Sequence, residues 1–145
     1  MMKVCLRSSL AVVALFAAGC ASTGATRGSG GELESRAVRA LDLYLDCAHI
    51  HAEAMSGASG PASAVVDAAL ASCERRHARY CAATSEYLIS VAPPDDRTQA
   101  HERAQARCSR TREDAHGVLI GRVEEARALA AERLEQAVAA AMEAR

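Results

Sequence analysis

Two cysteine–histidine pairs carry residue types and a spacing that could bind a metal ion. His51 follows Cys47 by four residues, and His77 follows Cys73 by four. Residues four apart lie on one face of a helix. Two such pairs on neighbouring helices supply the ligand types of a Cys2His2 zinc site. Oxidation of the same cysteines to disulfides would remove the thiolates that such a site needs.

The spacing of the cysteines favours disulfides. Four cysteines lie beyond residue 20, which allows three pairings of two bonds. Facing residues of an antiparallel helical hairpin lie symmetrically about its turn. Cys47 and Cys73 have their midpoint at residue 60, within GASGP, and the midpoint of Cys81 and Cys108 falls at Pro93-Pro94. A bond from Cys47 to Cys81 would centre within a helix, and one to Cys108 would need parallel helices.

We therefore predict the bonds Cys47–Cys73 and Cys81–Cys108. Each closes a loop that is worth roughly 3.5 kcal/mol in the chain-entropy account. The same register argues against zinc, because His51 would then face residue 69 and lie about 12 Å from His77. The other histidines, His49, His101 and His116, offer no obvious ligand set. We expect neither a metal nor a cofactor.

Arginines form the most distinctive surface pattern. Arg75, Arg76 and Arg79 lie on one predicted helix, and Arg103, Arg107 and Arg110 lie on the next. A cluster of this kind could bind an anionic ligand such as a lipid headgroup or a glycan, and four of its members are candidate binding residues: Arg79, Arg103, Arg107 and Arg110. The alternative is a solvated face balanced by the acids Asp42, Asp46, Glu113 and Asp114, since exposed ion pairs are common and weak.

No residue pattern in the chain indicates a reaction. The sequence lacks G-x-S-x-G, a phosphate-binding glycine loop and H-E-x-x-H. The aromatic residues beyond the first twenty are Tyr44, Tyr80 and Tyr87, which suit core filling better than a stacking platform. We expect that the protein is not an enzyme.

The first twenty residues resemble the signal peptide of bacterial lipoproteins. Lys3 and Arg7 precede the apolar run LAVVALFAA, which is too short to span a bilayer. The segment FAAGC, residues 16–20, then resembles the lipobox, with alanine at position 17 where leucine is commoner. The resemblance implies cleavage before Cys20 and acylation of its thiol. Ala21, rather than aspartate, implies sorting to the outer membrane, facing the periplasm.

Three segments follow from these signals: a signal peptide at 1–19, the lipidated cysteine with a flexible tether at 20–31, and a single helical domain at 32–145. Apolar residues recur every three or four positions in three stretches. Helices are predicted at about 32–56, 61–91 and 95–145, and the sequence leaves open whether the last is continuous or broken near residue 117. Beyond residue 19 the formal charge is −3, which argues against a nucleic-acid binder.

The predicted fold is an all-α, antiparallel three-helix bundle, up-down-up, with a long C-terminal helix and disulfide staples. Its alanine-rich interior buries little apolar area and so needs such staples. We expect a non-enzymatic envelope lipoprotein with a structural or protein-interaction role. Its C-terminal helix would bind a partner or a second copy through an alanine-rich stripe. The alternative is a binding module for an anionic envelope ligand.

Overall fold

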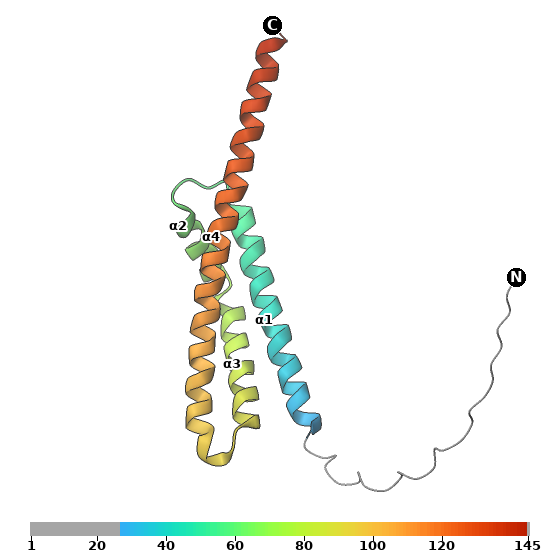
Figure 1. Ribbon diagram of the computed structural model, residues 1–145, viewed down its shortest axis with the longest axis vertical. Coiled ribbons are helices and arrows are strands. Elements are labelled where there is room, and N and C mark those ends of the chain that lie inside the picture. Colours follow the sequence, from blue (N-terminus) through green and yellow to red (C-terminus); the bar gives the residue numbers. More distant parts are fainter. Residues whose placement is uncertain (1–26, 145) are drawn as a thin grey trace, which may run out of the picture.

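The computed structural model describes residues 27–144, and all regular elements in that range are helical. They are α1 (Arg27–Met55), α2 (Ala62–Ser72), α3 (Glu74–Val91), a 3-10 turn at Pro94–Asp96 and α4 (Arg97–Glu143). In Figure 1, α1, α3 and the first half of α4 lie side by side, with α2 beside α4 near the upper end of α1. The fold is all-α with a long C-terminal helix, as predicted, but it has four helices rather than three.

α1 begins at Arg27, inside the segment predicted as a tether, and ends just before Gly57. The turn that follows contains Gly60, with φ 107°. Glycine adopts this left-handed conformation without steric cost. Pro61 then precedes α2, where its missing N–H costs no helical hydrogen bond. The predicted signal peptide and Cys20 lie outside the described residues.

The predicted single helix at 61–91 was wrong, because it is divided at Cys73 into α2 and α3. Cys73 has φ −102° and ψ 7°, outside the helical region. No glycine or proline marks this position. Two local causes are visible. The Ser72 hydroxyl donates a hydrogen bond to the carbonyl of Ala68, and bonds of this kind bend helices. Cys73 is also bonded to Cys47 of α1.

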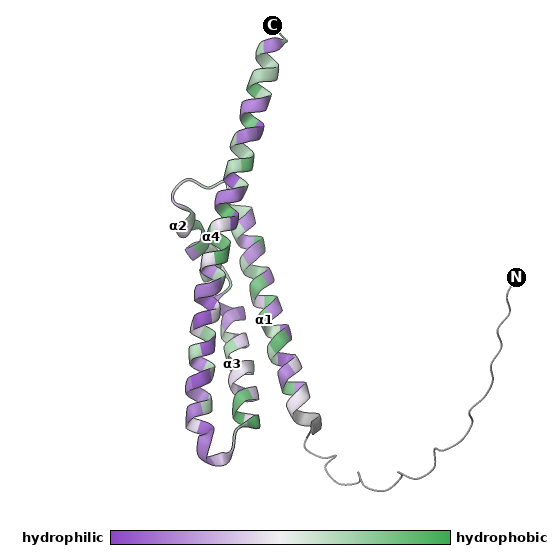
Figure 2. Cartoon of the chain, in the orientation of Figure 1, coloured by the Kyte–Doolittle hydropathy of each residue, from purple (hydrophilic) through white to green (hydrophobic). Residues whose placement is uncertain are grey.

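α4 is a continuous helix of 47 residues, about 70 Å long, with no break at Gly117. Its residues beyond Arg127 are all exposed. We call residues 128–143 the C-terminal arm, and Figure 1 shows that it extends beyond the other helices. Hydrophobic and hydrophilic residues alternate in bands along it (Figure 2). Within residues 27–144, none of the helices combines the length and apolar character needed to cross a bilayer.

The core is concentrated where α2 packs against α1 and α4. α2 is the most apolar helix (Figure 2), and it buries Val66, Ala69 and Leu70 almost completely. Tyr44 and Ala48 of α1 and Leu119 and Val123 of α4 complete this cluster. Below it, α3 and α4 meet through smaller residues. The interior is thin, as the alanine content predicted.

Arg127 fixes the loop between α1 and α2. Its three guanidinium nitrogens donate to the carbonyls of Ser56 at 2.9 Å, Gly60 at 2.8 Å and Ala58 at 2.6 Å. These carbonyls follow the C-terminal end of α1, where helical partners run out. One charged side chain of α4 therefore holds the turn that α1 and α2 share.

Two buried tyrosines should respond in opposite ways to loss of their hydroxyl. The Tyr44 hydroxyl has no hydrogen-bond partner among the described residues, whereas Tyr80 bonds Thr111 Oγ1 at 3.0 Å. Leaving a buried polar group unpaired costs about 1–3 kcal/mol, and an ordinary hydrogen bond contributes about 1 kcal/mol. Tyr44→Phe should therefore raise the free energy of unfolding by about 1 kcal/mol, and Tyr80→Phe should lower it by about as much. Urea unfolding of both variants tests this, and a loss of stability in Tyr44→Phe would contradict it.

Candidate functional site

The predicted pair Cys47 and Cys73 lies at disulfide distance. The two sulfurs are 2.07 Å apart and the Cα atoms 6.0 Å apart. Both residues are buried in the main core cluster. The bond joins the middle of α1 to the junction of α2 and α3. It therefore ties the apolar α2 to the rest of the bundle.

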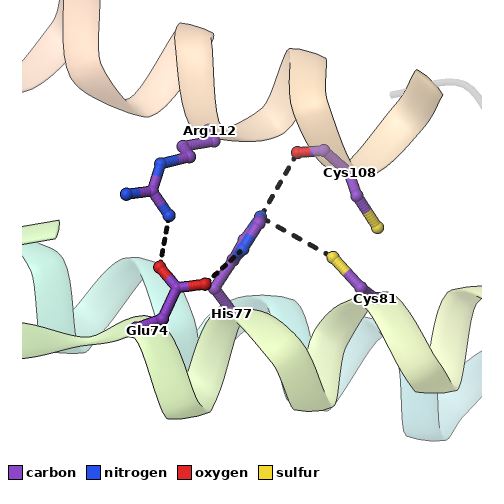
Figure 3. Close-up of polar contacts among 5 residues, drawn as sticks. All are labelled: Glu74, His77, Cys81, Cys108 and Arg112. Atoms are coloured by element: carbon purple, nitrogen blue, oxygen red, sulfur yellow. Dashed lines mark hydrogen bonds and ion pairs between the residues drawn. The ribbon is translucent and has the colours of Figure 1, made fainter. Parts of the chain in front are cut away.

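Cys81 and Cys108 are present as thiols, and the bond between them stays a prediction. They come from opposite helices, α3 and α4, and their sulfurs face each other in Figure 3. The two thiols lie on the floor of a cleft of about 460 Å³, whose polar rim is Ser85, His101, Gln105 and Ser109. The predicted register thus brings together the right two residues.

A row of polar side chains runs along α3 beside these thiols (Figure 3). Glu74 pairs with Arg112 of α4 and lies 3.9 Å from His77 Nδ1. His77 Nε2 lies 3.6 Å from Cys81 Sγ and 3.3 Å from the carbonyl oxygen of Cys108. The Arg112 guanidinium holds the pKa of the Glu74 carboxyl below its usual value. Sequence reasoning did not identify this row.

The row has the residue types of a cysteine–histidine–glutamate triad, but its geometry does not favour nucleophilic catalysis. A carbonyl oxygen only accepts, so His77 Nε2 carries a proton towards Cys108 and offers Cys81 no base. Burial, followed by the adjacent Cys108 thiol, raises the pKa of Cys81 to about 12. Cys81 also lies within a helix, where backbone N–H groups are already bonded and cannot stabilise an oxyanion. Burial and the neighbouring Cys108 thiol, rather than the row, favour the neutral thiol of Cys81.

The histidines separate as the register predicted. The ligand atoms of Cys47, His51 and Cys73 lie within 4.8 Å of one another. His77, the fourth member of the Cys2His2 pattern, instead contacts Cys81 and Cys108. Because Cys47 and Cys73 are bonded to each other, neither presents a thiolate to an ion. The residues do not fit a zinc site in this oxidation state.

The arginines do not form one binding surface in the clefts of the structure. Arg75, Arg76 and Arg79 line a cleft of about 630 Å³ built from α2 and α3. Arg103 lines a different one, with Val91 and Pro93 at the α3–α4 turn. Within residues 30–144, no acid lies within ion-pairing distance of these arginines, of Arg107 or of Arg110. The expected balancing acids therefore do not pair with them.

Three of the four larger apolar residues of the C-terminal arm lie on one side, and Leu129 is the exception. At about 100° per residue, Ala130 and Val138 lie within about 40° of Leu134, and Met142 within about 80°. Leu134 is 66% exposed, Val138 51% and Met142 73%. Leu119 and Val123, which are buried in the core, lie on the same side of α4. The arm thus extends the buried face of α4 beyond the helices that cover it.

The polar row beside the thiols could be predicted from the sequence, whereas the contacts of Arg127 could not. The hairpin register that pairs Cys81 with Cys108 also places Arg112 opposite His77, so the row beside the thiols could have been found. No sequence signal indicates that Arg127 would bind three carbonyls of a loop. Cys20, the candidate lipidation site, lies outside the described residues.

Compared with known proteins, the chain matches no family model, no curated protein and no solved structure.

Proposed function

We propose that this chain is a non-enzymatic envelope lipoprotein whose C-terminal arm binds a helix of another envelope protein. Acylated Cys20 would anchor it to the outer membrane, and the helical domain would face the periplasm. The proposal depends above all on one observation: the apolar face of α4 continues for about four turns past the last helix that covers it. Residues 128–143 have no helix packed against them among the described residues, so tertiary packing does not stabilise the arm.

The composition of the arm favours a protein partner over a lipid surface. Residues 128–143 contain three glutamates and one arginine, a formal charge of −2. Anionic headgroups would repel this charge. Alanine at positions 130, 137 and 141 allows another helix backbone to approach closely, with Leu134 and Val138 as the larger contacts.

Site-specific photo-cross-linking in cells tests the proposal. A photoreactive residue replaces either Val138, on the apolar face, or Gln136, on the opposite face. We expect one protein adduct of defined mass from position 138 and none from position 136. The substitution Leu134→Glu should remove the adduct, whereas Gln136→Glu, which adds the same charge to the back of the helix, should retain it.

The mass of the adduct also identifies the occupant. An adduct with twice the mass of the chain would show that the arm binds a second copy of this chain rather than another protein. Equal adducts from both faces, or no adduct from either, would contradict a docking role for the arm.

A second candidate function is binding of an anionic envelope ligand. The favouring observation is the cleft at Arg75, Arg76 and Arg79, none of which forms an ion pair with the described acids. This cleft supports the α3 arginines as binding residues rather than those of α4. Replacement of Arg75 and Arg79 by glutamine should then abolish salt-sensitive binding to anionic vesicles, and replacement of Arg107 and Arg110 should not.

A further inference from the structure

A groove runs between α1 and α4 on a side of the bundle to which neither α2 nor α3 contributes. Its wider part is a hollow of about 540 Å³, lined by α1 residues from Leu41 to His49 and α4 residues from Thr111 to Arg122. A smaller hollow adjoins it and shares His49, Leu119 and Arg122. Together they extend from Leu41 to Ser56, just past the end of α1, over a length of about 22 Å.

The floor of the groove is apolar. Leu41, Leu45 and Ala48 come from α1, and Ala115, Val118 and Leu119 come from α4. Val118 is 61% exposed and Leu45 38% exposed. α1 and α4 both run upward in Figure 1, so a helix in this groove would occupy the fourth position of a bundle. Apolar side chains between two parallel helices are the usual receptor for an amphipathic helix.

The rim of the groove is acidic. Asp46 of α1 and Asp114 and Glu125 of α4 line it, and none of them is in an ion pair within the described part of the chain. Glu53 also lines it and pairs with His49 at 3.1 Å. Arg122 is the one arginine that lines both hollows. The uncompensated charge of the groove is therefore negative, and both α1 and α4 contribute to it.

We propose that the α1–α4 groove binds a basic amphipathic helix of about four turns. Apolar side chains of the partner would lie on the floor, and its lysines or arginines would face Asp46 and Asp114. The arm of a second copy is the obvious competitor, but its own negative charge would meet the acidic rim. The proposal concerns a different surface from the arm, and each can fail without the other.

Titration with designed peptides tests the proposal. The full acylated chain is placed in nanodiscs of zwitterionic lipid, with empty nanodiscs as a control. The first probe is an 18-residue helix with leucines on one face and lysines elsewhere, and the second has glutamate at every lysine. We expect saturable binding of the lysine peptide, at least tenfold weaker binding of the glutamate peptide, and weaker binding at higher salt.

Matched variants locate the binding. Val118→Lys places a positive charge in the groove, and Ala54→Lys places one at an exposed position of α1 that does not line it. Val118→Lys should weaken binding of the lysine peptide at least tenfold, and Ala54→Lys should change it less than twofold. Leu134→Glu, which disables the arm, should leave the affinity unchanged.

Three results would overturn the proposal. They are equal binding of the two peptides, equal loss of affinity from Val118→Lys and Ala54→Lys, and no binding of the lysine peptide. Self-association of the chain that disappears in Val118→Lys would also overturn it, because the groove would then hold a second copy.

Discussion

Replacing Cys47 by serine should lower the free energy of unfolding by about 3.5 kcal/mol, because it opens a loop with a sequence separation of 26. For a domain of this size such a loss lowers the melting temperature by roughly 10–20 °C. The effect is large because the interior is thin. Cys47 and Cys73 belong to the one cluster that contains Val66, Leu70 and Tyr44. The bond also holds α2, the most apolar helix, against α1.

Thermal unfolding followed by circular dichroism measures this loss. Cys73→Ser should cause a similar loss, and the double variant should be little worse than either single one, because all three lack the same bond. Ser35→Ala, which removes an exposed hydroxyl from α1 twelve residues before Cys47, serves as the control. A melting temperature within 3 °C of wild type in Cys47→Ser would show that the core is stable without its staple.

The hairpin register was predictable from the sequence because it depends on symmetry rather than on exact helix ends. GASGP and Pro93-Pro94 mark the two turns, and residues equidistant from a turn face each other. This places Cys47 beside Cys73 and Cys81 beside Cys108, even though the helix between the turns is divided in two. The same symmetry places Arg112 opposite His77.

Local breaks were less predictable. The interruption at Cys73 has neither glycine nor proline, and it arises where a serine hydroxyl bonds the preceding turn. The sequence left a break near Gly117 open, and α4 is continuous there. One glycine costs a helix only about 1 kcal/mol. Buried Ala115 and Leu119 on either side of it pack against the core and offset that cost.

The arginine pattern shows the limit of reading a surface from sequence alone. Register places Arg79 opposite Arg110, but it does not say on which side of the helix pair each side chain emerges. In the structure Arg79 lines a cleft of α2 and α3 to which α4 contributes nothing. Rotation about each helix axis, set by which residues the core buries, decides such questions.

Oxidation of Cys81 and Cys108 should form a second staple and add about 3.5 kcal/mol to the free energy of unfolding. The two sulfurs face each other from α3 and α4 (Figure 3), so the bond would join side chains that already point toward each other. Cys108→Ala keeps the Cys47–Cys73 bond and the Cys81 thiol but cannot form the second bond. It therefore serves as the reference for the protein without that bond. Differential alkylation of protein from the envelope, read by mass spectrometry, should find Cys81 and Cys108 linked.

The protein with the Cys81–Cys108 bond and the protein without it should also differ in how their stability changes at high pH. In the open form, burial raises the pKa of Cys81 to about 12, above the ordinary thiol value near 9. A raised pKa favours the neutral thiol in the folded state, so its contribution is complete below pH 9 and is lost as the pH rises towards 12. Burial, the largest cause of the raised pKa, remains in Cys108→Ala. This variant should therefore lose stability above pH 9 faster than the oxidised protein, in which Cys81 does not titrate. Parallel pH profiles would contradict a bond between these two residues, as would free thiols at both positions in native protein.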